Sequence, residues 1–380
     1  MRKSAFQIIV AISLATAGCA KSPAVDEPIE APATLLHGGY QPVATPPPSG
    51  GAANAASHFI PHALQWPVVF QDAAHEIGNS MAEFQPYGAP YWHGGCDLRV
   101  VPGAEVRAPV DGVVEAGHYS YAMNTDGSMT KYWLAWPAAG NDTYFEAAIV
   151  TDDGTRFEFH HINRMTLPAH VLELIKNNGR ITAGETLGYA IAWPDGDYNH
   201  IHYNVVAKSG ERINPEYISS TIADSAPPQV NGIYAVFQNA VVSPFGNGHF
   251  SSSPVEFVTD VVDFQDHNVY AHPPALSRLV FASGEAVTWD FRKSLTRAGG
   301  GFPPIWEFFK ESLATSTGQM LQTSGGYGTG TSLVRLKVPA GAAGAFKIEF
   351  GDQNDNRFVI DGSIAPPVAK SSSFLSDKAR

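Results

Sequence analysis

Short runs of β-branched and aromatic residues, separated by turn signals, recur along residues 58–222. Asp-Gly pairs occur in "PVDGVV" (residues 109–114) and in "TDDGTRFEF" (residues 151–159), each between alternating apolar positions. Such pairs are typical of tight β-hairpin turns, so this region is predicted to form short antiparallel strands. One helix is predicted at residues 168–179, "PAHVLELIKNNG", because its last glycine suits a helix C-cap.

The alternating pattern continues after "SAPPQV" in "VEFVTDVVDF", "SLVRLKV" and "AFKIEF", which glycine-rich turns separate. It predicts a second, mostly antiparallel β domain of the sandwich type over residues 228–366, with a short helix at "IWEFFKESL". The polar end of the chain, residues 367–380, is predicted to be disordered. The predicted fold class is therefore mainly β, with two successive β domains.

The start of the chain has the pattern of a secretion signal. Arg2 and Lys3 precede an apolar run, residues 5–17, that is too short to span a bilayer. The run ends in "LATAGCAK", which resembles the lipobox of bacterial lipoproteins, where cleavage precedes a cysteine that is then acylated. The resemblance implies a signal peptide over residues 1–18 and a lipid on Cys19. The alternative is an ordinary signal peptide with a chance cysteine.

Residues 19–57 are rich in proline, alanine and glycine and hold too few large apolar residues to form a core, so they are predicted to be a tether. Ala20, directly after the cysteine, is similar to the outer-membrane sorting signal of Gram-negative lipoproteins. The expected location is the cell envelope, on the periplasmic face of the outer membrane. The membrane would then be a partner through the lipid.

The composition excludes one class of partner and limits how the fold can be stabilised. The formal net charge is −12 and lysine and arginine do not cluster, which argues against nucleic acid as a partner. Besides Cys19 the chain has only Cys96, so no disulfide framework is expected. Stability must come from hydrophobic cores, and the 44% hydrophobic composition is ample for two of them.

The stretch "NHIHYNVV", residues 199–206, places two histidines two positions apart in a predicted strand. Because side chains alternate along a strand, His200, His202 and Asn204 share one face and the apolar residues between them face the core. A pair of imidazoles on one face suits a metal site. An ordinary solvated strand face is the alternative, since short motifs often occur by chance.

A second candidate motif is "YWHGGCDLRV", in which His93 and Asp97 flank two glycines. Glycine permits a backbone path that turns both side chains toward one point. Catalytic zinc takes three protein ligands and keeps one position open, and nitrogen plus carboxylate oxygen suit it. His93, Asp97 and one of the paired histidines would supply that set. Cys96 is a further possible ligand, although a packing role fits a lone buried cysteine better.

The third element is "TRFEFHHINRM", predicted to be the return strand of the hairpin at residues 151–159. In a regular strand Phe159 and His161 face one side, while Glu158 and His160 face the other. Adjacent histidines are therefore not expected to enter one cleft together. Alternation alone leaves open which of the two does.

Five motifs, "HGGCD", "APVDGVVEAG", "FHHIN", "ITAGETLGYA" and "HIHYN", follow the order seen in the lysostaphin and LytM-type zinc peptidases, which cleave peptide bonds of bacterial peptidoglycan. The family pattern is His-x-Gly-x-Asp, then Tyr-x-His-Leu, then Ala-Gly before a strand, then His-x-His. The resemblance covers residues 85–208. It implies a LytM-like metallopeptidase domain over residues 58–222, built as a small antiparallel β-sandwich with a groove across one sheet.

Carried over by position, the resemblance implies Zn²⁺ as cofactor and three metal ligands: His93, Asp97 and His202. It implies catalytic roles for His161 and His200. His161 is preferred to His160 because "FHHI" aligns with Tyr-x-His-Leu when Phe159 takes the aromatic position. No glutamate lies beside these ligands in the sequence, so the two catalytic histidines are expected to transfer protons and to stabilise the oxyanion.

Some positions depart from the family pattern. Tyr198 precedes the His-x-His motif where the family has a small turn, and Asn204 follows it where the family has an acidic residue. Residues 118–144 are longer than a tight connection requires, and their aromatics could line the groove or pack in the core. Asp195 and Asp197 are candidates for orienting a ligand histidine, although Pro-Asp-Gly favours a turn.

The predicted function is a zinc-dependent endopeptidase acting on the peptides of peptidoglycan. The alternative is a catalytically silent LytM-like binding or regulatory lipoprotein that activates another cell-wall hydrolase. Such proteins are expected to lose ligands, whereas all five positions are present here. A third possibility is that the C-terminal β domain, residues 228–366, dominates by binding glycan or a protein partner that the sequence does not identify.

Overall fold

The computed structural model describes residues 41–42, 55–86, 90–123, 129–194, 196–296, 302–325 and 330–366, with only the backbone given for 41–42, 119–123 and 129–133. The predicted signal peptide with Cys19, most of the predicted tether and the predicted disordered tail lie outside these residues. Asp195 does too.

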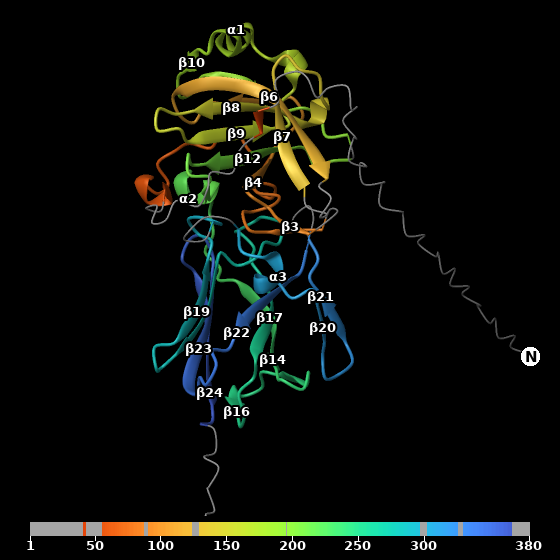
Figure 1. The fold of residues 1–380 in the computed structure, drawn as a ribbon, viewed down its shortest axis with the longest axis vertical. Helices are drawn as coiled ribbons and strands as arrows, with labels where there is room; N and C mark the ends of the chain where they lie inside the picture. Colours follow the sequence, from red (N-terminus) through yellow and green to blue (C-terminus); the bar gives the residue numbers. More distant parts are fainter. Residues whose placement is uncertain are drawn as a thin grey trace, which may run out of the picture.

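The described chain is mainly β, as predicted, and forms two bodies stacked end to end (Figure 1). The main sheet of the first body is built from β1 (Gln41–Pro42), β4 (Cys96–Arg99), β6 (Gly112–Met123), β7 (Met129–Ala135), β8 (Phe145–Val150), β9 (Arg156–His160), β10 (Arg180–Ile181), β12 (His200–Val206) and β13 (Arg212–Ile213). All its pairs are antiparallel, in the order β1-β7-β6-β8-β9-β12-β13, with β10 beside β6 and β4 beside β12. The predicted hairpin joins β8 to β9.

Smaller elements surround this sheet. They are the paired strands β5 (Glu105–Arg107) and β11 (Thr186–Tyr189), helices α1 (Ala169–Asn177) and α2 (Pro215–Ile218), and 3-10 helices at Ala55–His58, Asp142–Tyr144 and Arg164–Thr166. The helix predicted at residues 168–179 is thus present as α1. Its left-handed C-terminal residue is Asn178, with φ 49°, and not the glycine expected there, because asparagine also tolerates this conformation.

Alternation along β12 decides which face of the main sheet is the core. Ile201, Tyr203 and Val205 are fully buried in the first hydrophobic cluster, as the sequence pattern predicts. Tyr203 stacks on Phe159 of β9 with ring centroids 5.1 Å apart. Each such buried side chain stabilises the fold by about 1.5–3 kcal/mol. The opposite face of the same strands is therefore left for polar side chains.

The second body consists of two packed sheets. One contains β14 (Gln229–Val236), β15 (Val242–Pro244), β17 (Glu256–Val262) and β22 (Ser332–Lys337); the other contains β16 (His249–Phe250), β18 (Leu276–Phe281), β19 (Ala286–Asp290), β23 (Gly344–Gly351) and β24 (Arg357–Ile364). Phe257 of the first sheet and Phe346 of the second meet in a common core, with ring centroids 5.1 Å apart. The body is a sandwich whose strands pair antiparallel, except that β16 runs parallel to β24.

The remaining elements are β2 (Phe84–Gln85) paired with β3 (Tyr91–Trp92), β20 (Ser312–Ala314) paired with β21 (Met320–Gln322), and α3 (Ile305–Phe308). The short helix expected at "IWEFFKESL" covers only the first half of that stretch. Among the described residues, no helix is both long and apolar enough to cross a membrane.

The two hydrophobic cores do not follow the predicted domain boundaries, residues 58–222 and 228–366. Met81, Phe84 and Trp92 lie within the range predicted for the first domain but pack in the hydrophobic cluster of the second body. Trp92 Nε1 donates to the carbonyl of Pro303 at 2.6 Å, and Asn268 Nδ2 donates to the carbonyl of Ile77 at 2.9 Å. The segment that leads to the motif "YWHGGCDLRV" is therefore held by both bodies.

The predicted tether also ends earlier than expected. Ala56 is fully buried in the first hydrophobic cluster, although it lies inside the range 19–57. A small apolar residue can be buried without a surrounding run of large ones, which is why composition alone misses it.

Candidate metal centre

Strand pairing brings the two candidate motifs together. β4 and β12 are antiparallel neighbours in a register that places Asp97 directly opposite His202. His93 precedes β4 by way of Gly94 and Gly95. A Cβ atom at Gly95 would lie 2.2 Å from the backbone oxygen of Tyr203, so only glycine lets this segment approach β12 closely enough.

Three donor atoms converge on one point. His93 Nε2 lies 2.9 Å from His202 Nδ1 and 3.1 Å from Asp97 Oδ1, and the last two atoms are 2.8 Å apart. In a tetrahedral zinc site with bonds of about 2.0–2.1 Å, ligand atoms lie about 3.3 Å apart. The set of two nitrogens and one carboxylate oxygen therefore fits zinc with small outward movements.

Backbone carbonyls orient three imidazoles. The Nδ1 of His93 lies 2.9 Å from the oxygen of Ser80, that of His161 lies 2.6 Å from the oxygen of Thr143, and that of His200 lies 2.7 Å from the oxygen of Tyr198. A carbonyl only accepts hydrogen bonds, so each Nδ1 donates its proton and each Nε2 keeps a lone pair. For His93, a candidate ligand, this hydrogen bond is the support that metal-binding histidines usually have.

Both neighbouring histidines enter the site, which corrects the expectation that only one could. His160 ends β9 opposite His202, and their ring centroids are 4.9 Å apart. His161 follows the strand with φ 67°, a left-handed conformation that breaks the alternation. Its ring turns away from the core side of Phe159 and lies 4.6 Å from the ring of His200. The residues of β9 alternate between the two faces of the sheet, whereas His161, which lies beyond the end of the strand, does not follow this alternation.

Most charge states here suit a metal site. The exception is His93, whose pKa burial would lower but the neighbouring Asp97 raises. Burial by itself would raise the pKa of Asp97, but the rings of His200 and His93 hold it well below its usual range. Burial, followed by the neighbouring His200, lowers the pKa of His161 well below the ordinary value, and burial also lowers that of His200. Near neutral pH the carboxylate is therefore ionised, and His161 and His200 are neutral and able to accept a proton.

Two aromatic side chains border the histidine pair and were not singled out from the sequence. The Trp193 ring lies 4.8 Å from that of His161 and 4.9 Å from that of His200. Tyr144 lies 5.8 Å from His161 by ring centroids. The only sequence signal for Tyr144 was its membership of the long segment 118–144, whose aromatics were left open between groove and core.

Behind His202 lies a buried polar layer that sequence reasoning also missed. The side-chain amide of Asn204 is 3.0 Å from His160 Nε2 and 3.0 Å from His202 Nε2, so it bridges the two rings. His160 Nε2 in turn lies 3.1 Å from Glu146 Oε2. Glu146, Glu158 and His160 form a compact group, with one donor atom of each within 4.8 Å of the others. Glu146 lies outside the sequence motifs. Glu158 lies two positions before His160 on the same face of the strand, but nothing in the sequence indicated that it joins this group.

The other candidate residues lie elsewhere. Cys96 is fully buried in the first hydrophobic cluster, where its thiol lies 3.8 Å from Glu216 Oε1, and burial raises its pKa well above the ordinary value. This agrees with the packing role. Asp197 is exposed, and its backbone oxygen accepts a hydrogen bond from Arg99. Among the described residues, the side chain of Asp197 forms no hydrogen bond or ion pair with a histidine of the site. Three of the histidines are oriented by backbone carbonyls.

Comparison with known proteins adds little. No protein-family model matches the chain, and no curated protein matches it. Among solved structures, a chain of the "Structure of the SpoIIQ-SpoIIIAH pore forming complex" is 12% identical, with a TM-score of 0.27; the match covers 43% of this chain and 94% of that chain. The function proposed below therefore rests on the geometry of the site.

Proposed function

We propose that the protein is a zinc-dependent endopeptidase that hydrolyses peptide bonds of bacterial peptidoglycan, anchored as a lipoprotein through Cys19 at the periplasmic face of the outer membrane. The observation that carries the proposal is the convergence of His93, Asp97 and His202, whose donor atoms are 2.8–3.1 Å apart, beside the neutral pair His161 and His200. The ordered resemblance of the five sequence motifs to LytM-type peptidases supports the substrate class.

His93, Asp97 and His202 would hold the metal. When bound, zinc supplies Lewis acidity, which lowers the pKa of a water ligand to about 7 and polarises a carbonyl. His161 and His200 each direct an Nε2 lone pair away from the carbonyl that holds Nδ1. Either can accept a proton from the attacking water and, once protonated, donate to the developing oxyanion or the leaving amine.

The surroundings support this chemistry in two ways. The rings of Trp193 and Tyr144 stand beside the histidine pair and exclude water from one side of it. The hydrogen bonds to Thr143 and Tyr198 fix both rings before substrate arrives, so little reorganisation is needed during proton transfer.

The test uses the full chain, with metal content measured by mass spectrometry and soluble muropeptides released from purified peptidoglycan measured by chromatography. We expect about one zinc per chain and release by the wild type. His93→Ala should lose both zinc and release, whereas His200→Ala should keep zinc and lose most release. His170→Ala, on the exposed face of α1, is the matched control and should behave as the wild type.

Two outcomes would overturn the proposal. Stoichiometric zinc without release under any condition would favour the silent regulatory lipoprotein. Release that survives in His93→Ala would exclude the zinc mechanism.

A further inference from the structure

Three carboxylates from distant parts of the chain meet where the second body joins residues 219–228, the connecting segment between α2 and β14. Asp224 belongs to that segment, Asp263 directly follows β17, and Asp352 directly follows β23. One oxygen from each lies within 4.8 Å of the others. Asp352 is fully buried and Asp263 is 6% exposed. Asp224 and Asp263 also line a cavity of about 30 Å³.

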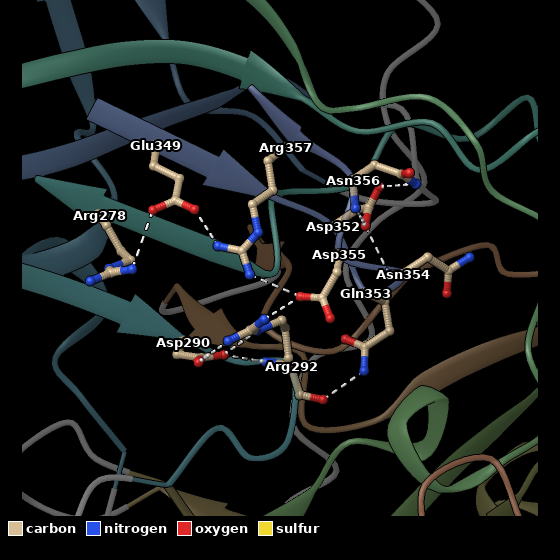
Figure 2. Close-up of polar contacts among 10 residues, drawn as sticks. All are labelled: Arg278, Asp290, Arg292, Glu349, Asp352, Gln353, Asn354, Asp355, Asn356 and Arg357. Carbon is tan, nitrogen blue, oxygen red and sulfur yellow. Dashed lines mark hydrogen bonds and ion pairs between the residues drawn. The ribbon is translucent and has the colours of Figure 1, made fainter. Parts of the chain in front are cut away.

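No basic side chain in the described part of the chain forms an ion pair with any of the three. The nearby acidic residues contrast with them (Figure 2). Asp355, in the same turn as Asp352, pairs with Arg357 at 3.0 Å and with Arg292 at 2.5 Å. Arg292 and Arg357 therefore pair with the neighbouring Asp355, and they form no ion pair with the cluster of Asp224, Asp263 and Asp352.

Asp263 supplies an independent sign of a missing ligand. Its Oδ1 is buried and has no hydrogen-bond partner, although its backbone is held by a two-way bridge to His272. A buried carboxylate oxygen without a partner is costly, because the water it loses on folding is not replaced. Asp263 lines the cavity beside the other two carboxylates, where a bound cation or a shared proton would satisfy this oxygen.

The cluster is held in place before any ligand arrives. Asp352 Oδ1 accepts hydrogen bonds from the backbone N–H of Asn354 at 2.8 Å and of Asn356 at 2.9 Å. The side-chain amide of Asn354 donates to the backbone oxygen of Ile222 at 2.9 Å, and that of Asn356 donates to the backbone oxygen of Asp224 at 3.0 Å. The turn therefore holds the connecting segment and keeps Asp224 close to Asp352.

Electrostatics agree with this geometry. Burial, followed by the neighbouring Asp352, raises the pKa of Asp224 to about 7. Burial and the neighbouring acids also raise the pKa of Asp263 well above its usual range. The like charges repel one another when nothing else is bound. Either a bound cation or protons shared between the carboxylates must offset this repulsion. These two alternatives predict different responses to added metal.

We propose that Asp224, Asp263 and Asp352 bind one calcium-class divalent cation, which clamps the connecting segment to the second body. All three donors are carboxylate oxygens, the ligands of hard cations rather than of zinc. Calcium is preferred to magnesium because a 30 Å³ cavity holds about two waters, whereas magnesium usually keeps several. The site is separate from the candidate zinc centre in both residues and donor type.

The test is calorimetric titration of the full chain with calcium or magnesium after treatment with EGTA, together with thermal unfolding. We expect one saturable calcium site and a rise in Tm of about 5 °C or more at a hundredfold excess over Kd. Asp263→Asn should lose both effects. Asp361→Asn, at an exposed aspartate of β24 that pairs only with Lys347 among described residues, is the control and should keep them.

His93→Ala should also keep the calcium response, because that variant alters only the zinc ligands. If Asp263→Asn does not fold, Asp224→Asn tests the same site on the less buried side. The absence of saturable calcium binding by the wild type, or an equal response in a folded Asp263→Asn, would overturn the proposal in favour of shared protons. Neither result bears on peptidase activity, so the two proposals can fail separately.

Discussion

At the scale of single residues, the position of one proton decides what each histidine can do. His161 and His200 both donate Nδ1–H to a carbonyl, so their free nitrogens face the site. His160 is different, because it reaches His202 through the amide of Asn204. It supports a proposed metal ligand and has no direct contact with His200. The adjacent histidines therefore have separable roles.

This separation gives a testable prediction. His161→Ala should keep its zinc and lower kcat by about 10²–10⁴-fold with KM little changed, because it removes proton transfer only. His160→Ala should weaken zinc binding by about 10–100-fold, because it removes support from behind His202. Zinc affinity by competition with a chelating dye and steady-state kinetics on a peptidoglycan peptide would check both. The opposite pattern would show that the roles of the two histidines are exchanged.

At the scale of elements, the centre depends on how closely the segment before β4 approaches β12. The two adjacent glycines of this segment are not equivalent. A Cβ atom at Gly95 would meet backbone oxygen and the Asn204 side chain at 2.2–2.3 Å, whereas one at Gly94 would lie 3.8 Å from the nearest atom, in Arg212. The first contact is impossible without separating the strands, and the second is ordinary packing.

Gly95→Ala should therefore destabilise the protein by about 1–3 kcal/mol and weaken zinc binding at least tenfold, because it displaces Asp97 from His202. Gly94→Ala is a matched control with the same change in composition and should leave both quantities close to the wild type. Urea unfolding and zinc titration would measure the two effects. Equal behaviour of the two variants would contradict the close approach of the strands.

At the scale of the whole molecule, the second body takes part in building the candidate centre. Phe84 and Trp92 are buried in its core, and His93 follows Trp92 directly. The backbone oxygen of Ser80, which orients His93, lies in the same segment. Removing the second body would expose these aromatic side chains and release the segment from its support.

A chain truncated after residue 225 should accordingly aggregate or bind zinc substoichiometrically, even though it contains every proposed zinc ligand. Size-exclusion chromatography and zinc analysis would test this. The full chain is the reference, and Trp92→Phe in the full chain, which keeps the buried ring but loses the bond to Pro303, should show a small effect on zinc. A monomeric, fully zinc-loaded fragment would show that the first body folds independently.

Much of the fold and of the candidate site could be predicted from alternation and spacing. The burial of Ile201, Tyr203 and Val205 follows from the period of a strand, as does the shared face of His202 and Asn204. The β8–β9 hairpin and helix α1 follow from local turn and cap signals. The set His93, Asp97 and His202 followed from residue chemistry together with the family resemblance, and the structure places these side chains together.

What only the tertiary structure decided concerns groups that no local pattern connects. The carbonyls of Ser80 and Thr143 and the cluster of Asp224, Asp263 and Asp352 depend on contacts between distant segments, and the left-handed turn at His161 departs from the alternation of its strand. The physical reason is that strand and helix periodicities arise from backbone geometry over a few residues. Convergence across a hundred residues depends on strand register and on the packing of two cores, and these are settled only when the whole chain folds.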